Sequence, residues 1–537
     1  MNIPPRRDRL CAAIAMAAIL VALPCTVSAA FADPAPGVTM AEQAIRGNPV
    51  WITTDHARIE ALQADFRSGG QITQACLSCH TEAAGQIHQT LHWTWQAFVD
   101  ENGNVYGKGG DSLNNFCISA NRMQDKQCLN CHPGWGTRTD TINCLNCHGS
   151  KTLNWEEAFE DLEVFSDSDD PEEQQIADEL RADIQAAVQA VVRPQRSNCG
   201  ACHFKGGGGD GVKHGDLDSS LSRPDKALDV HMAADGRNFQ CTRCHTTTVH
   251  NIAGRVYTRP AAVARTSLIE DDLATKITCE SCHGGHPHKS LSKANDHVDK
   301  VACQSCHIPT FARVNPTKMS WDWSQAGRTR DGKPYKTKNA FGMDDYLSIK
   351  GQMSWEKNIV PTYFWYDGTI DSITARDKID PSGPVAVSHP MGHAGDTRAR
   401  IAPFKVHRSR QPYDKVHKTL LAPLLSGPDG YWQTLDWQRA LNKGMQAMAL
   451  PYSGEFDFVD TTYVFPITHM VAPKDNAVAC TECHTHTGSR LAAITGVYMP
   501  GRDRVDLLDL IGWIAVFGSL GGVCLHGSMR LVTHFKR

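Results

Sequence analysis

Eight short cysteine motifs constrain this chain more than any other feature. The pattern Cys-x-x-Cys-His uses sixteen of the 20 cysteines in 537 residues. Two thiols three positions apart reach the two vinyl groups of one porphyrin, and the next histidine binds its iron. Neither disulfide frameworks nor zinc knuckles require that histidine. The sequence therefore predicts eight covalent hemes c, held by Cys76/Cys79/His80, Cys128/Cys131/His132, Cys144/Cys147/His148, Cys199/Cys202/His203, Cys241/Cys244/His245, Cys279/Cys282/His283, Cys303/Cys306/His307 and Cys480/Cys483/His484.

The remaining histidines predict the sixth ligands of most irons. Of 25 histidines, eight belong to the motifs, so seventeen are left for this role. A second histidine can ligate the heme iron on the face opposite the motif histidine. At each position the alternative is a surface histidine that binds no iron. The candidates are His88, His92, His214, His231, His250, His286, His288, His297, His389, His393, His407, His417 and His469.

Two apolar segments predict export and anchoring. Arg6, Arg7 and Arg9 precede an apolar run and a small-x-small site, which is typical of a signal peptide cleaved before Asp33. Residues 510–529 lack formal charge and are long enough to span a bilayer. We expect a signal peptide (1–32), a periplasmic octaheme domain (33–504), a transmembrane helix (505–533) and a cytoplasmic tail (534–537), anchored in a bacterial inner membrane. The net charge of −4, without a basic patch, excludes a nucleic-acid partner.

The spacing of the motifs predicts a mostly α fold. Seven motifs crowd into residues 76–307, where segments are too short for an ordinary core, so we expect helices and loops wrapped around eight covalent hemes, plus one C-terminal transmembrane helix. Asp170 and Pro171 predict a helix start, and apolar residues every four positions from Ile176 to Val188 predict its buried face. The motif-free interval 308–479 is expected to return over the hemes and supply ligands.

Several longer patches resemble one family. Asn114-Asn115-Phe116-Cys117-Ile118, residues 198–203 with the following glycines, residues 212–218, residues 301–309 and residues 496–503 are similar to the octaheme tetrathionate reductase family. The resemblance implies a heme arrangement like that of pentaheme nitrite reductases and hydroxylamine oxidoreductases. It also implies that the second heme is the active site and that a lysine is one of its axial ligands.

The residue that matches this lysine is Lys108, in a glycine-rich turn before Cys128. An amine binds iron only when neutral, so its pKa must be lowered by burial and by the metal. A surface lysine in a turn is the alternative. The sequence leaves open whether Lys108 or His132 is the retained ligand. Cys117 lies close to this motif in sequence and is a candidate to bond a sulfur substrate, with a small buried side chain as the alternative.

The resulting hypothesis is a periplasmic reductase of a small anionic or nitrogenous substrate such as tetrathionate, nitrite or hydroxylamine. Three alternatives stay open: a non-catalytic electron carrier, an oxidase similar to hydroxylamine oxidoreductase, and an octaheme nitrite reductase. The last usually shows Cys-x-x-Cys-Lys, and this sequence has none.

The apolar C-terminal segment also predicts a membrane partner. Gly518, Gly522, His526 and Arg530 recur every four residues and would line one stripe of a helix. A histidine within a membrane span is costly and usually has a partner. We expect an integral membrane b-type cytochrome, or another quinol-linked donor, to pack there. In the stronger version of this prediction, His526 ligates a shared heme b.

Overall fold

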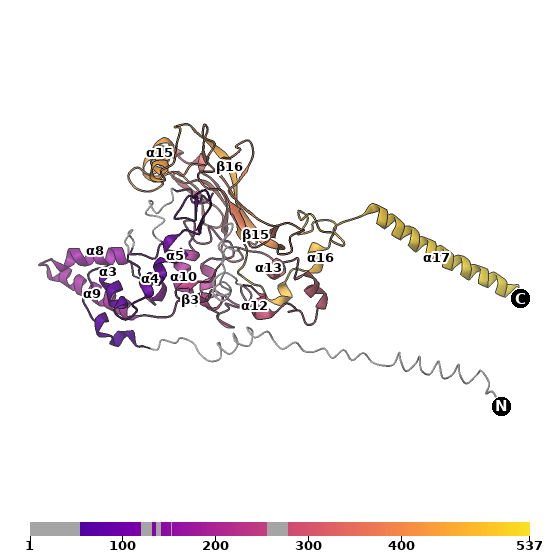
Figure 1. The fold of residues 1–537 in the computed structure, drawn as a ribbon, viewed down its shortest axis with the longest axis horizontal. Helices are drawn as coiled ribbons and strands as arrows, with labels where there is room; N and C mark the ends of the chain where they lie inside the picture. The colour runs from indigo at the N-terminus through magenta and orange to yellow at the C-terminus, as the bar shows by residue number, and fades with distance from the viewer. Residues whose placement is uncertain (1–53, 120–130, 136–140, 152, 255–277, 537) are drawn as a thin grey trace, which may run out of the picture. The chain divides into compact units, whose positions relative to one another are not determined.

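The computed structural model describes residues 54–119, 131–135, 141–151, 153–254 and 278–536. The signal peptide, Cys128 and Arg537 lie outside these residues. The chain divides into two units, Met1–Pro49 with Thr278–Asn295 and Val50–Ile277 with Asp296–Arg537. In the smaller unit, the described part contains α12 (Glu280–His283), which carries the sixth motif (Figure 1).

Most heme motifs of the larger unit fold into a short helical turn. The backbone N–H of the motif histidine donates to the carbonyl of the first cysteine at 3.0 Å in the first and third motifs. This turn places both cysteines on one face, as attachment to a single porphyrin requires. The motif-bearing elements are α3 (Gly69–Leu77), α7 (Leu145–His148), α10 (Arg196–His203), η4 (Cys241–Arg243), α13 (Cys303–His307) and α16 (Cys480–Cys483).

The helix predicted after Asp170 is present. α9 (Pro171–Gln189) begins where the Asp170 carboxylate accepts the Glu172 N–H, and it pairs with α8 (Trp155–Ser166). Ile184 and Val188 are buried in a cluster with side chains of α8 and α3. Ile176 is 41% exposed, so the predicted apolar face holds only toward the end of the helix. The remaining helical elements are η1 (His56–Arg58), η2 (Glu60–Leu62), α4 (Ala83–His88), α5 (Leu91–Thr94), η3 (Ser219–Ser222), η5 (Ser292–His297), η6 (Trp323–Gln325), α14 (Tyr431–Thr434), α15 (Trp437–Ala447) and η7 (Lys474–Asn476).

An eight-stranded mixed sheet occupies the motif-free interval. Its strands run in the order β13-β16-β15-β5-β10-β9-β8, and β11 also pairs with β15. Figure 1 labels the two central strands, β15 and β16. The two long central strands are antiparallel over eleven residue pairs. The sheet strands are β5 (Thr317–Asp322), β8 (Lys336–Lys338), β9 (Asp344–Leu347), β10 (Gly351–Glu356), β11 (Thr362–Tyr366), β13 (Val385–Ala386), β15 (Arg400–Asp414) and β16 (Phe456–Pro466). Two-stranded ribbons join β1 (Phe98–Val99) to β2 (Val105–Tyr106), β3 (Thr247–Thr248) to β4 (Asn251–Ile252), β6 (Thr329–Arg330) to β7 (Lys333–Pro334) and β12 (Ile370–Ser372) to β14 (Ser388–Pro390).

This sheet corrects the predicted fold class. The chain is 33% helical and 19% strand, so "mostly α" is wrong. The physical reason lies in residues 308–479, where aromatic and β-branched side chains are frequent and fit a pleated, half-buried surface. The covalent hemes substitute for an ordinary core only beside the motifs, and this interval builds a core of its own.

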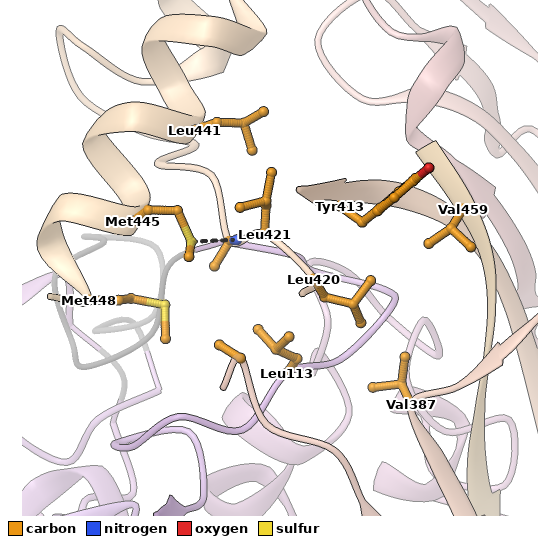
Figure 2. Close-up of a cluster of buried hydrophobic side chains, with 11 residues drawn as sticks. Leu113, Val387, Tyr413, Leu420, Leu421, Leu441, Met445, Met448 and Val459 are labelled. Atoms are coloured by element: carbon orange, nitrogen blue, oxygen red, sulfur yellow. Dashed lines mark hydrogen bonds between the residues drawn. The ribbon is translucent and has the colours of Figure 1, made fainter. Parts of the chain in front are cut away.

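That core packs α15 against the sheet. Leu441 and Met445 of α15, with Met448 directly after it, meet Leu420 and Leu421 of the segment that precedes the helix (Figure 2). Other members of the cluster include Tyr413 and Val459 of the sheet, Val387 between β13 and β14, and Leu113 of the loop before the second motif. Burial of these side chains ties the loop that holds Asn114–Cys117 to the sheet.

The C-terminal segment forms one long helix, α17 (Asp506–Phe535). It has a mean hydropathy of 1.8 over its most apolar stretch and no buried residue, so it is long and apolar enough to cross a membrane.

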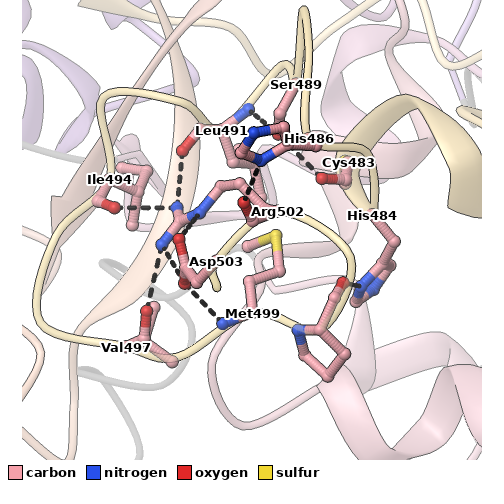
Figure 3. Close-up of polar contacts among 11 residues, drawn as sticks. Cys483, His484, His486, Ser489, Leu491, Ile494, Val497, Met499, Arg502 and Asp503 are labelled. Carbon is pink, nitrogen blue, oxygen red and sulfur yellow. Dashed lines mark hydrogen bonds and ion pairs between the residues drawn. The ribbon is translucent and has the colours of Figure 1, made fainter. Parts of the chain in front are cut away.

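A loop closed around one arginine precedes this helix. Arg502 donates to the carbonyls of Leu491 (2.7 Å), Ile494 (2.8 Å) and Val497 (3.0 Å), as Figure 3 shows. Its guanidinium also pairs with both oxygens of Asp503 at 2.7 Å. A guanidinium presents five donors in a fixed plane, which lets this single side chain satisfy three carbonyls and a carboxylate.

Arg502→Met is therefore expected to destabilise this part of the protein by about 3 kcal/mol, because it leaves the carbonyls of Leu491, Ile494 and Val497 without their donor. The shift of the midpoint of unfolding in guanidinium chloride measures this loss of stability. Arg504→Met is the matched control, since Arg504 is exposed. Equal midpoints for the two variants would contradict the role given to Arg502.

Candidate heme centres and active site

The second cysteines of the motifs occupy different places on their short helices. Cys79 lies beyond the end of α3 and Cys244 directly follows η4, whereas Cys282 lies within α12. Heme attachment at these three cysteines stays a prediction.

The backbone at these three positions has the turn that a heme motif needs. The N–H of the second cysteine donates to the carbonyl of the first at 3.2 Å for Cys79, 3.2 Å for Cys244 and 3.1 Å for Cys282. This bond holds the two cysteines of one motif within a single turn, as attachment to one porphyrin requires.

Attachment cysteines of different motifs also meet one another. Within the described ranges, no cysteine forms a disulfide. Cysteines of three pairs of motifs lie close together, namely Cys76 and Cys144, Cys131 and Cys202, and Cys199 and Cys241. The first and third motifs, the second and fourth, and the fourth and fifth are therefore neighbours, as short electron-transfer steps between their hemes require.

The motif histidines are oriented as iron ligands need to be. In three motifs the ring Nδ1 lies at hydrogen-bond distance from a backbone carbonyl, which leaves Nε2 available. The bonds run from His148 to Val192 (3.1 Å), from His245 to Ala253 (2.7 Å) and from His484 to Pro500 (2.8 Å). Such a bond fixes the tautomer and the ring orientation of a metal-binding histidine.

Four motif histidines also face a second imidazole at a distinctive distance. Two imidazoles that share one metal, each with a metal–nitrogen bond of about 2.0–2.1 Å, have ring centres about 6 Å apart. The observed pairs are His80–His56 (6.4 Å), His203–His92 (6.1 Å), His245–His469 (6.4 Å) and His484–His297 (6.0 Å). These residues fit heme iron, which when bound supplies single electrons.

Three of the four partners were predicted, and His56 was missed. It is the only histidine between the start of the chain and Cys76, which is the signal that singles it out. His469 is held by Asp216, whose carboxylate accepts the His469 backbone N–H at 2.9 Å and lies 3.2 Å from its Nδ1. Although burial alone would raise the pKa of Asp216, this contact lowers it to about 2.

The other predicted ligands lie in varied surroundings. His88 has a buried Nε2 without a hydrogen-bond partner, and His250 bonds to Gln86 at 2.7 Å. His214 packs edge-on to Phe465, and His231 stacks on Phe239. His286 and His288 lie in the smaller unit, and His393 accepts the Gly395 N–H. The last three lie on or near the strands: His389 is exposed on β14, His407 is buried on β15, and His417 follows β15.

The second motif differs from the others. His132 is buried, and its Nε2 lies 2.9 Å from the carbonyl of Trp93, so the nitrogen that the three motif histidines described above leave free is engaged here. Its Nδ1 is buried without a hydrogen-bond partner. The rings of Trp93 and Trp95 pack against the imidazole at 4.6 and 5.6 Å. These contacts favour a lysine, rather than His132, as the retained ligand at this centre.

Lys108 is anchored to the same tryptophan segment. The Gly109 N–H donates to the Trp95 carbonyl at 2.8 Å, and the Gly107 N–H donates to Ser112 Oγ at 2.8 Å. Gly107 has a φ of 119°, and a Cβ there would lie 2.2 Å from the Trp95 carbonyl oxygen. Only glycine fits this close approach, so the glycine-rich turn has a structural reason.

A second lysine meets the chemical requirement for a neutral amine. Lys213 is partly buried, and loss of water around its amine, with the nearby charge of Lys108, lowers its pKa to about 8, although the Cys131 thiol opposes the shift. Its backbone N–H bonds Gly206 O at 3.2 Å, and Gly207 packs against Phe116. Residues 212–218 belong to the patches that resemble the octaheme family, but that resemblance implied no role for Lys213.

The unpredicted sheet adds further cations beside Lys213. Lys405 of β15 is fully buried and donates to Val212 O (2.8 Å), Lys213 O (3.1 Å) and Thr317 Oγ1 (2.6 Å). Burial lowers the pKa of Lys405 to about 7, even though Asp216 opposes this shift. The amines of Lys213 and Lys405 each lie 5.9 Å from the ring centre of Phe465.

Cys117 lies in the loop that the sheet positions. Its N–H donates to Asn114 Oδ1 at 2.8 Å. The neighbouring Asn115 amide donates to the His407 carbonyl at 3.0 Å, and its Oδ1 lies 2.9 Å from Nδ1 of the His407 ring. The Cys117 thiol interacts electrostatically with the buried amine of Lys318 on β5. The structure therefore brings Cys117, Lys213 and the cations of the sheet into one neighbourhood, although their segments are far apart in sequence.

Comparisons with known proteins agree with this chemistry. A profile described as "Cytochrome c bacterial" matches residues 318–487, and one described as "Cytochrome c7 and related cytochrome c" matches residues 226–319. The chain is similar to the crystal structure of octaheme cytochrome c from Shewanella oneidensis, with 38% identity, a TM-score of 0.67, and coverage of 82% of this chain and 95% of that chain. No curated protein sequence matches.

The motifs and these likenesses define a multiheme c-type cytochrome, a protein that carries covalent heme c for electron transfer. More specifically, the chain belongs to the octaheme cytochrome c family. The family predicted from the sequence patches, that of the octaheme tetrathionate reductases, is confirmed.

Proposed function

We propose that this cytochrome binds eight hemes c and reduces a small oxidised substrate, tetrathionate in the first place, at the centre of its second motif. The observation that carries the proposal is the distinct environment of His132, whose Nε2 is engaged by Trp93 O at 2.9 Å while two lysines lie nearby. The pairs His80–His56, His203–His92, His245–His469 and His484–His297 are the proposed axial ligands of four electron-transferring hemes.

Lys213 is the lysine that the environment favours as the retained ligand. Loss of water around its amine lowers its pKa to about 8, which reduces the free-energy cost of the neutral form that iron would bind, and it lies near Cys131 of the same motif. Lys108, the lysine predicted from the sequence, then contributes its positive charge to the site and attracts an anion. The reverse assignment, with Lys108 on the iron, is distinguished by the paired variants described in the Discussion.

The surrounding cations suit an anionic substrate. Tetrathionate carries two negative charges, and its central S–S bond accepts two electrons to release two thiosulfates. Lys108 provides positive charge, which stabilises the negative charge that develops as the bond breaks. Nitrite is also an anion, whereas hydroxylamine would depend on binding through nitrogen. Cys117 remains the proposed thiol of the site.

Steady-state kinetics test the function directly. The purified holoprotein, with a reduced viologen as donor, is expected to reduce tetrathionate with higher kcat/KM than nitrite or hydroxylamine. Absence of turnover with all three, together with a purely low-spin ferric spectrum, would instead establish an electron carrier. A tyrosine cross-link in the mass spectrum of the heme peptides would identify an oxidase.

We further propose that α17 anchors the heme-bearing part outside the inner membrane. Its apolar length supports a membrane span, and Arg530, Lys536 and Arg537 follow the apolar stretch, which favours a cytoplasmic C-terminus. An integral membrane b-type cytochrome, or another quinol-linked donor, is the proposed partner. His526 is the proposed ligand to a heme b shared with such a subunit.

A further inference from the structure

A cavity lies inside the loop that Arg502 closes. It has a volume of about 530 Å³, within the range of small-ligand sites. It is lined by His486, Gly488, Ser489, Ala492, Ile494, Thr495, Gly496, Val497, Arg502 and Asp503. The fixed network around Arg502 shapes this wall, since that side chain holds three of the loop carbonyls (Figure 3).

One wall of the cavity is bonded to the eighth heme motif. Ser489 Oγ donates to the carbonyl of Cys483 at 2.7 Å, and the Arg490 N–H donates to the carbonyl of Glu482 at 2.9 Å. His484 bonds Pro500 O on the other side of the loop. A molecule in this cavity therefore sits beside the turn that carries the His484–His297 pair.

The opposite end of the loop leads directly into the apolar helix. Asp503 lines the cavity, and α17 begins at Asp506. Three residues of chain span at most about 10 Å, so the cavity lies close to the first turn of the helix wherever that helix is oriented. If α17 enters a membrane, the cavity lies at the membrane surface.

The lining offers both apolar contact and hydrogen bonding. Ala492, Ile494 and Val497 provide apolar side chains, and Thr495 provides a hydroxyl. His486 contacts Arg502 O through Nδ1 at 3.2 Å, which leaves its Nε2 for a ligand. A flat ring with a hydroxyl or carbonyl at its edge matches this combination. Because the eighth heme motif lies beside the cavity, the ring should be redox-active. Because α17 begins close to the cavity, the molecule should be dissolved in the membrane lipid.

We infer that this cavity binds the ring of a membrane quinol, so that the quinol itself, rather than a b-type subunit, is the electron donor. The inference deepens the proposed function and rests on the anchoring stated there. Oxidation breaks the two O–H bonds of the quinol and releases both protons to water at the exposed mouth of the cavity. A heme held by Cys480, Cys483 and His484 would accept the two electrons one at a time. The product is the quinone.

Binding of a quinol-site probe tests the inference on the full-length holoprotein in detergent. The probe is a fluorescent alkyl-hydroxyquinoline N-oxide, whose fluorescence is quenched when it binds beside heme. Ala492→Trp fills the cavity, and Ala493→Trp is the matched control, because Ala493 is exposed and does not line it. We expect saturable quenching in wild type and Ala493→Trp, and binding at least about tenfold weaker in Ala492→Trp.

Reduction by duroquinol should fall by about the same factor in Ala492→Trp, while viologen-driven substrate reduction stays at the wild-type level. That second rate also shows that the variant is folded, and Thr495→Trp repeats the test from another wall. Unchanged binding in both cavity variants, or no saturable binding in wild type, would overturn the inference. Loss of a co-purifying b-type subunit from Ala492→Trp, with no effect on probe binding, would instead make the loop a docking surface. Probe binding without substrate reduction would overturn the proposed function alone.

Discussion

Replacement of Lys213 by methionine is expected to reduce substrate turnover by about 10²-fold or more, because it removes the amine that we assign to the iron of the second motif. All hemes should remain attached, since no motif residue changes. The ferric electron paramagnetic resonance spectrum should change at one iron only. Methionine keeps the length and apolar stem of lysine, so the packing of the stem against Gly206 is retained.

Two matched variants make this prediction specific. Lys205→Met removes an exposed lysine of the same loop and should have no effect. Lys108→Met should raise KM for an anionic substrate with little change in the iron spectrum, because it removes charge but no ligand in our assignment. A spectral change in Lys108→Met and none in Lys213→Met would reverse the two roles and restore the assignment made from the sequence.

His469→Ala is expected to destabilise the protein by about 3 kcal/mol and to turn one low-spin iron high-spin. Its removal leaves the buried Asp216 carboxylate without the imidazole that lies 3.2 Å away, and an unpaired buried charge is costly. The loss of one imidazole of the His245–His469 pair accounts for the spin change. Denaturant unfolding and the resonance spectrum measure the two effects separately.

His389→Ala is the control, because this predicted ligand is exposed on β14. It should leave both stability and spectrum unchanged. A spectral change in His389→Ala would place that residue on an iron and weaken the use of imidazole spacing as the criterion. An unaltered spectrum in His469→Ala would remove His469 from the ligands even if the protein were less stable.

The sequence by itself determined the class of protein and the candidate attachment residues. Cys-x-x-Cys-His needs no tertiary context, because one helical turn brings both thiols and the imidazole to the same porphyrin, as α7 and α10 illustrate. The helix after Asp170 and the apolar helix after Asp506 could also be predicted from local sequence. The N-terminal cap marks the start of the first, and apolar composition over its length marks the second.

Which motifs lie side by side was not local in this sense. Cys199 lies close to Cys241, and Cys131 lies close to Cys202, although each pair belongs to two different motifs. Other segments of the chain decide these contacts, so the spacing within a motif carries no information about them.

The strands of residues 308–479 could not be read from the sequence either. β15 is buried on both faces along most of its length, so it lacks the alternation that marks a half-exposed strand. It also carries Lys405 and His407 in its interior, and these polar residues obscure its apolar character. The hydrogen bonds that satisfy them come from residues 115, 212, 213 and 317, which no local pattern connects to β15.

Tertiary structure alone brings particular histidines together and places the amine of Lys213 close to Cys131. The partner of His245 is 224 positions away at His469, while that of His80 is the nearby His56, so sequence separation carries no information about pairing. The sequence around Lys108 and Lys213 does not distinguish the two lysines, since glycines lie near both. They differ because folding removes water from the amine of Lys213 beside Cys131, and that desolvation exists only once the loop, the motif and the sheet have come together.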